Sequence, residues 1–142
     1  MKDVLFLIGS ESDRSAVEAG TALLEEKGIS FELKVLSAHR NLEELVAFLK
    51  NREPEFRLVI AAAGLSAALP GIAASIVSLP VIGIPLSVGS LSGVDALLSI
   101  LQLPQGVPVA TMGIGKQGVL NAVYLAERIL RTGSPAGGAP RT

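Results

Sequence analysis

Cysteine and tryptophan are absent from this sequence, and histidine and tyrosine occur once each among its 142 residues. Without cysteine there can be no disulfide bond, thiolate metal site or cysteine nucleophile, which suits the reducing environment of the cytoplasm. A single histidine, His39, argues against a zinc site, and we expect no metal. The four phenylalanines and one tyrosine are too few to form stacking platforms for nucleic-acid bases.

An excess of positive charge is also lacking, because 12 Lys and Arg residues face 13 Asp and Glu residues. The net charge of −1 provides no basic surface, so we expect no nucleic-acid partner. The length suits one domain with a full hydrophobic core, and we assign residues 1–131 to a single α/β domain. Residues 132–142 are rich in glycine and proline and are expected to form a disordered tail.

Charge is missing altogether from residues 58–94. An uncharged stretch of this length is typical of a membrane-spanning helix. However, Pro70, Pro80 and Pro85, together with several glycines, divide it into pieces shorter than about 17 residues. We therefore expect no membrane partner and predict buried strands and helices, with part of the apolar surface covered by other subunits.

Five strand-like segments alternate with five segments of helical periodicity. Strands are predicted at residues 4–8, 30–36, 58–62, 81–84 and 107–111. Helices are predicted at about residues 13–27, 41–53, 69–77, 92–101 and 116–131. This alternation predicts a three-layer α/β/α fold around a five-stranded parallel sheet, with the flavodoxin-like strand order 2-1-3-4-5. Apolar and charged side chains alternate in residues 30–36, which favours an edge position for that strand.

Two of the predicted helices begin beside polar side chains that suit a helix cap. Asn41 is followed three residues later by Glu44, which is a variant of the capping box. Ser92 and Asp95 stand in the same relation at the start of the fourth helix. We expect side-chain caps at both positions.

The only histidine lies in Ser37-Ala38-His39-Arg40, at a predicted strand-to-helix turn. In an open α/β sheet such turns line the ligand crevice. The other turns at this edge are dominated by small residues, which let a ligand approach the backbone and its free N–H groups. Arg40 can bind a phosphate through two parallel hydrogen bonds. The residues alone thus predict a phosphorylated ligand, with His39 either moving a proton or serving only in the structure.

Three common catalytic motifs are absent from the sequence. There is no G-x-G-x-x-G dinucleotide fingerprint, no G-x-x-x-x-G-K-[ST] phosphate loop and no G-x-S-x-G nucleophile elbow. Spacing alone therefore leads no further than an α/β domain that binds a phosphorylated small molecule.

A series of ordered motifs nevertheless resembles one enzyme family from Val4 to Leu130. The motifs are GSESD at 9–13, SAHR at 37–40, AALPG at 67–71, PVIGIP at 80–85, LSGVDALLS at 91–99 and QLPQGVPVAT at 102–111. They are similar to those of the N5-carboxyaminoimidazole ribonucleotide mutases of purine biosynthesis, also called the catalytic subunit of phosphoribosylaminoimidazole carboxylase.

This resemblance implies a homo-octamer and a reaction without metal or organic cofactor. The carboxylate on the exocyclic nitrogen of the aminoimidazole ribonucleotide moves to ring carbon C4, by way of carbon dioxide held in the pocket. His39 is then the general acid and base, since an imidazole titrates near neutrality. By position, the substrate-binding residues are Ser10, Asp13 and Arg40. Further backbone or hydroxyl contacts are expected from Ser37, Ala38, Gly64, Ser66 and Ala67.

Two positions depart from the family pattern. The bacterial mutases have Gly-Gly-Ala-Ala-His-Leu-Pro-Gly where this chain has residues 64–71, so Ala68 replaces a second histidine. Asn41-Leu42 replaces a Thr-Pro pair, and asparagine can cap a helix as well as threonine. Ala68 leaves three alternatives to a mutase, which is an isomerase: a lyase that carboxylates aminoimidazole ribonucleotide with free carbon dioxide, a related nucleotide carboxylase, and an inactive nucleotide-binding homologue.

Overall fold

The chain folds around one parallel sheet with the strand order β2-β1-β3-β4-β5. The structure is a computed structural model and describes residues 1–133. The strands are β1 (Val4–Ile8), β2 (Phe31–Val35), β3 (Leu58–Ala63), β4 (Val81–Pro85) and β5 (Ala110–Thr111). The predicted flavodoxin-like order is therefore confirmed.

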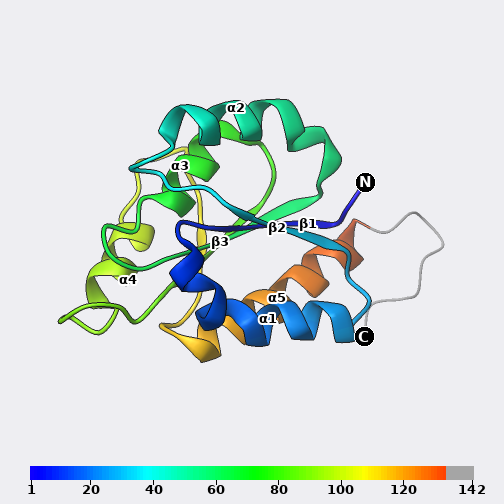
Figure 1. The fold of residues 1–142 in the computed structure, drawn as a ribbon. Helices are drawn as coiled ribbons and strands as arrows, with labels where there is room; N and C mark the ends of the chain where they lie inside the picture. Colours follow the sequence, from blue (N-terminus) through cyan, green and yellow to red (C-terminus); the bar gives the residue numbers. More distant parts are fainter. Residues whose placement is uncertain (134–142) are drawn as a thin grey trace.

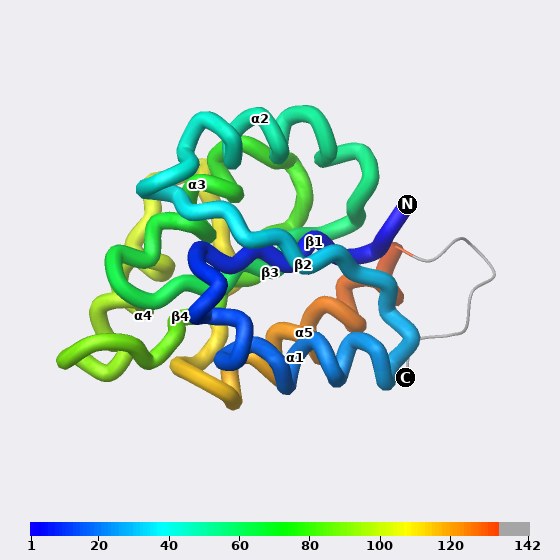
Figure 2. Tube along the Cα trace, in the orientation of Figure 1, coloured from blue at the N-terminus to red at the C-terminus, as the bar shows by residue number. Residues whose placement is uncertain are grey.

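Helices cover both faces of the sheet, as Figure 1 shows. They are α1 (Arg14–Glu26), α2 (Leu42–Arg52), α3 (Leu69–Ile76), α4 (Val94–Leu101) and α5 (Lys116–Thr132), with short 3₁₀ turns η1 (Glu11–Asp13) and η2 (Glu53–Glu55). The α1 and α5 helices run side by side on one face, and α2 and α3 lie on the other (Figure 2). The predicted three-layer α/β/α arrangement is confirmed.

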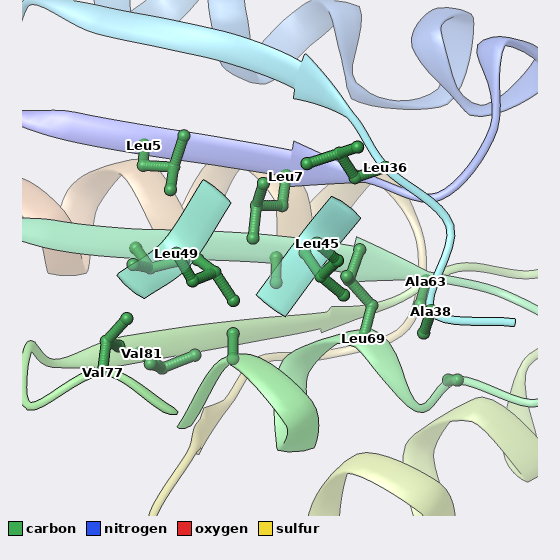
Figure 3. Close-up of a cluster of buried hydrophobic side chains, with 14 of the residues drawn as sticks. Leu5, Leu7, Leu36, Ala38, Leu45, Leu49, Ala63, Leu69, Val77 and Val81 are labelled. Atoms are coloured by element: carbon green, nitrogen blue, oxygen red, sulfur yellow. The ribbon is translucent and has the colours of Figure 1, made fainter. Parts of the chain in front are cut away.

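The two faces of β1 anchor the two halves of the core. Because successive side chains of a strand point to opposite faces, Leu5 and Leu7 pack towards α2 and α3 (Figure 3). Phe6 points the other way and packs with Val17 and Leu24 of α1. Complete burial of such a side chain stabilises the fold by about 1.5–3 kcal/mol, so the continuous apolar sequence of β1 fixes it in the centre of the sheet.

The β2 strand lies at the edge of the sheet, as its alternating sequence predicts. All five of its residues are half-buried. Arg52 of α2 donates two hydrogen bonds of 2.8 Å to the carboxylate of Glu32, which ties the helix to this edge. The guanidinium holds the pKa of the Glu32 carboxyl below its usual range by hydrogen bonding to the ionised form.

Both predicted side-chain caps are wrong. Asn41 makes no capping hydrogen bond from its side chain, and neither does the residue before α4. That residue is Gly93, which has φ 89°, and Ser92 before it has φ 53°. A left-handed turn therefore leads the chain into α4, and it leaves the Ser92 hydroxyl outside the capping position.

The last strand is shorter than predicted, while the last helix is longer. Only Ala110 and Thr111 pair with β4, because Pro108 has no N–H to donate to a neighbouring strand. The α5 helix ends at Thr132 instead of residue 131. Residues 134–142 of the predicted disordered tail lie outside the described residues.

The long uncharged segment contributes β3, α3 and β4 to the interior. Every residue of β3 and β4 is buried. In the part of the chain that the structure describes, no helix combines the length and the apolar character needed to cross a bilayer. Packing within one subunit therefore accounts for much of the burial that this uncharged segment requires.

Candidate active site

A cleft of about 420 Å³ opens at the carboxyl ends of the central strands. The chain leaves β1 towards the face covered by α1, and it leaves β3 towards the opposite face covered by α3. Neighbouring strands whose connections diverge in this way form a topological switch point, where open α/β sheets bind their ligands. The fold thus places the cleft where a small-molecule site is expected.

Eight of the nine predicted site residues line this cleft. They are Ser10, Asp13, Ser37, Ala38, His39, Arg40, Gly64 and Ser66. The ninth, Ala67, is only 1% exposed, packs in the hydrophobic core and does not line the cleft, and the backbone contact expected of it stays a prediction. Its neighbours Ser66 and Ala68 line the cleft, whereas the Ala67 side chain packs into the hydrophobic core and holds the loop there.

The cleft also contains residues that the sequence analysis did not select. They are Gly9, Ser12, Ala63, Leu65, Ala68, Leu69 and Val88. Ser12 belongs to the same short turn as Ser10, so its place in a recognisable motif could have identified it. Leu65 and Val88 had no such signal, because an isolated aliphatic side chain carries no chemistry that points to a ligand.

The Ser37 side chain builds the turn that carries the candidate catalytic residue. Its Oγ accepts hydrogen bonds from the backbone N–H groups of His39, at 3.2 Å, and Arg40, at 3.1 Å. The Ser37 carbonyl accepts a third bond, from the N–H of Asn41, at 3.0 Å. These bonds fix the direction in which His39 and Arg40 leave the backbone.

The first loop presents hydroxyl groups to the same cleft. Ser10 Oγ accepts a hydrogen bond from the backbone N–H of Ser12 at 3.2 Å and lies 2.9 Å from Ser12 Oγ. The Ser10 carbonyl accepts from the N–H of Asp13 at 3.0 Å, which closes the η1 turn. The turn therefore holds two hydroxyls and one carboxylate at the rim.

Partial burial raises the pKa of the Asp13 carboxyl, and a hydrogen bond from the Ser10 backbone opposes this shift. A raised pKa means that the fold favours the neutral acid, so the ionised carboxylate reduces stability at neutral pH. That cost is absent below about pH 4, where the group is protonated in both folded and unfolded chains. A destabilising carboxylate at a cleft suits a binding role.

We expect Asp13→Asn to weaken ligand binding while stabilising the fold. An amide cannot supply the charge-assisted hydrogen bonds of a carboxylate, so nucleotide affinity should fall by about 10- to 100-fold. The free energy of unfolding at pH 7 should rise, and the gain should vanish below about pH 4. Calorimetric titration and urea unfolding at the two pH values measure both effects. A variant that loses stability at pH 7 would contradict this account of Asp13.

Arg40 is the only lysine or arginine among the residues that line the cleft. Its side chain is exposed and makes no hydrogen bond or ion pair with another residue in the range 1–133. By contrast, Arg14 on the neighbouring turn is occupied by two hydrogen bonds to Glu11. Arg40 is therefore the cation that is available to an anionic ligand.

His39 is exposed at the junction of two clefts. It lines the first cleft and also a second, of about 630 Å³, which shares Ser66 and Ala68 with the first. Its Nε2 atom lies 2.9 Å from the carbonyl oxygen of Ser66. The imidazole and Ala68, which stands where the family pattern has a second histidine, therefore line the same two clefts. Among residues 1–133 no three His, Cys, Asp or Glu side chains lie close enough together to hold a metal ion.

Solved structures of similar proteins have the same fold. A crystal structure of PurE from Treponema denticola superposes with a TM-score of 0.82 at 32% sequence identity, and covers 92% of this chain and 81% of that one. A second structure, of a PurE2 variant from the same organism, gives a TM-score of 0.83 at 31% identity, with 94% and 83% covered.

Sequence comparison gives the same relationship more strongly. This chain is 46% identical over 129 residues to the N5-carboxyaminoimidazole ribonucleotide mutase of Brucella melitensis, which covers 90% of this chain and 80% of that protein. It is 45% identical over 131 residues to the protein of the same name from Saccharolobus solfataricus, with 92% and 82% covered. The AIR carboxylase family model matches residues 3–137. The chain therefore belongs to the AIR carboxylase family.

Proposed function

We propose that this protein is an N5-carboxyaminoimidazole ribonucleotide mutase of purine biosynthesis. The observation that carries the proposal is the cleft itself, in which an unpaired arginine, a hydroxyl-rich turn and the only imidazole of the chain meet at the switch point of the sheet. The relatives named as this mutase are 40–46% identical over most of the chain, and they support the same choice of substrate.

The substrate is a ribonucleotide monophosphate, and the cleft offers a partner for each of its polar parts. Arg40 and the Ser10 hydroxyl suit the phosphate, because both present hydrogen-bond donors to its oxygens. Asp13 suits the ribose hydroxyls, which can donate to its carboxylate. Ala38 and Gly64 contribute backbone beside the ring, where small side chains let a ligand approach closely.

His39 moves the proton that the reaction requires. When carbon dioxide leaves, the bond from the exocyclic nitrogen to the carboxyl carbon breaks and that nitrogen gains a proton. When C4 attacks the carbon dioxide, a carbon–carbon bond forms and the C4 proton departs. One proton is given and one is taken, so a single imidazole returns to its starting state. Retaining the carbon dioxide beside C4 makes its recapture intramolecular.

Ala68 favours one second candidate, which is direct carboxylation of aminoimidazole ribonucleotide. The position beside His39 holds a methyl group in this chain, so the pocket lacks the second imidazole expected of a bacterial mutase. Purified protein should be offered each ribonucleotide with isotopically labelled bicarbonate. Conversion of the carboxyamino compound without label uptake supports the mutase, and activity confined to aminoimidazole ribonucleotide with label uptake supports the carboxylase. Binding of both compounds without turnover would refute both activities.

We further propose that the protein works as a homo-octamer in the cytoplasm. Three large apolar side chains share one exposed face of α4, at helical spacing, and a fourth is exposed in the turn before the helix. This apolar row consists of Val94, Leu98 and Leu101 on the helix and Leu91 in the turn, which are 50–60% exposed. A contiguous apolar row on a water-soluble enzyme is costly unless another subunit covers it, and repeated copies of this chain supply such a cover.

Replacing Leu98 with aspartate should reduce the molecular mass of the particle in solution. A carboxylate buried at a subunit contact would be unpaired, and such a charge costs several kcal/mol per interface. Analytical ultracentrifugation measures the outcome. The matched control is Leu42→Asp, since Leu42 is also exposed, at 46%, but lies on α2 away from the row. Unchanged mass in the Leu98 variant would remove this row from the assembly.

A further inference from the structure

We infer that the backbone carbonyl of Ser66 positions His39 by holding its neutral imidazole in the Nε2–H tautomer. Nδ1 is then the nitrogen that accepts and returns the proton, a consequence that rests on the proposed role of His39. The assignment makes the Ser66 carbonyl a positioning group, because this carbonyl acts on the reaction through His39.

The hydrogen-bonding chemistry of the contact determines the tautomer. The Nε2 atom lies 2.9 Å from the Ser66 carbonyl oxygen. A carbonyl oxygen can only accept, so Nε2 must carry the hydrogen and donate it. In the neutral ring the other nitrogen, Nδ1, is then unprotonated and basic. The bond survives protonation of the ring, since both nitrogens of the cation are donors, and it can therefore persist through a full catalytic cycle.

An unusual backbone conformation aims this carbonyl at the imidazole. Ser66 has φ 48°, in the left-handed region that residues other than glycine, asparagine and aspartate seldom adopt. The same carbonyl accepts the N–H of Ala68 at 2.6 Å, which uses its second lone pair and closes the loop. The buried Ala67 fixes the loop between these two residues. Strained backbone at a cleft is often retained because it preorganises a functional group.

The chain supplies its own control for this conformation. Among the described residues, Ser66 and Ser92 are the two that have a positive φ without being glycine, and the φ of Ser92 is 53°. Ser92 lies in the turn before α4 and is not among the residues that line either cleft beside His39. A valine at Ser92 or at Ser66 meets the same steric resistance to a positive φ, but only the change at Ser66 moves the carbonyl that His39 contacts.

The presence of a single histidine makes the tautomer directly measurable. Protein labelled with ¹⁵N-histidine gives one pair of imidazole signals, and at a pH where the ring is neutral the ¹⁵N shifts distinguish a protonated nitrogen from a bare one. We expect a protonated Nε2 and a bare Nδ1 in the wild type, in Ser66→Gly and in Ser92→Val. In Ser66→Val we expect a mixture of both tautomers.

Catalysis is then compared between two variants that both lack the serine hydroxyl. The kcat of Ser66→Val should be about tenfold lower than that of Ser66→Gly, the change expected for one lost hydrogen bond, with little difference in KM. A protonated Nδ1 in the wild type, or identical ¹⁵N shifts in the valine and glycine variants, would overturn the inference. If Ser66→Val does not fold, the wild-type shifts still decide. The Nε2–H tautomer in a protein that converts neither ribonucleotide would refute the proposed function and leave the tautomer assignment standing.

Discussion

Replacing His39 with asparagine is expected to lower turnover of N5-carboxyaminoimidazole ribonucleotide by about 10²- to 10⁴-fold, the usual contribution of a general acid and base. Asparagine keeps a planar polar side chain with an N–H donor, but its amide does not take up or release a proton near neutral pH. The His39 side chain is exposed, so its removal leaves no cavity in the core. The loss should therefore lie in kcat, while nucleotide affinity and the free energy of unfolding change little.

A variant of the neighbouring residue serves as the matched control. Arg40→Gln removes the cation proposed for the phosphate but keeps the imidazole. It should weaken substrate binding by about 10- to 100-fold, the value of one charge-assisted hydrogen bond, with a smaller effect on kcat. Stopped-flow assays of both variants, with calorimetric titration of the nucleotide, separate the two roles. A His39→Asn enzyme with near-normal kcat would leave the proposed proton transfer without an agent.

The central architecture was predictable because it depends on local sequence patterns. Residues 4–8 are apolar without interruption, which suits only a strand buried on both faces, and the structure places β1 at that position. The alternation of apolar and charged side chains in residues 30–36 indicates a strand with one exposed face, and it therefore predicted the edge position of β2. Once strands and helices alternate, the handedness of the connections leaves few topologies. The cleft then follows, since parallel strands bring their carboxyl ends to one edge.

The parts that could not be predicted depend on contacts between distant residues or on rare backbone conformations. Asn41 suits a helix cap by its residue type, yet its side chain makes no capping hydrogen bond, and Ser37 is the residue whose side chain organises the turn before α2. Ala67 lies in a recognisable motif but faces the core, because the loop turns at Ser66. Nothing in the identity of a serine indicates a positive φ, so the contact between Ser66 and His39 was invisible in the sequence.

Ala68 illustrates how a departure from the family pattern gains meaning only in the structure. In the sequence it is simply a missing histidine. In the structure it lines both clefts beside His39, so a small apolar side chain stands close to the candidate general acid and base. The choice between retained and free carbon dioxide is then a question of whether solvent carbon dioxide reaches the product, and label uptake in the bicarbonate assay measures that exchange.

Gly118→Ala is expected to destabilise the fold by about 3 kcal/mol or more, the upper range for overpacking a buried site. Alanine is ordinarily about 1 kcal/mol better than glycine inside a helix, so helix propensity predicts the opposite sign. Gly118 is buried in the first turn of α5, and a Cβ there would overlap the carbonyl oxygen of Gly113 and lie 2.7 Å from its carbonyl carbon. Both are backbone atoms, so no side-chain rotation relieves the clash.

The matched control for this prediction is the other partner of the contact, Gly113→Ala. A Cβ at Gly113 has nothing within 4 Å, and its φ is not in the left-handed region, so its stability should stay within about 0.5 kcal/mol of the wild type. Urea unfolding at one fixed protein concentration compares the two, since association would otherwise shift the midpoints. Equal midpoints would mean that the loop after β5 can retreat from α5. The close approach of Gly113 to Gly118 would then not be what holds this loop at the carboxyl edge of the sheet.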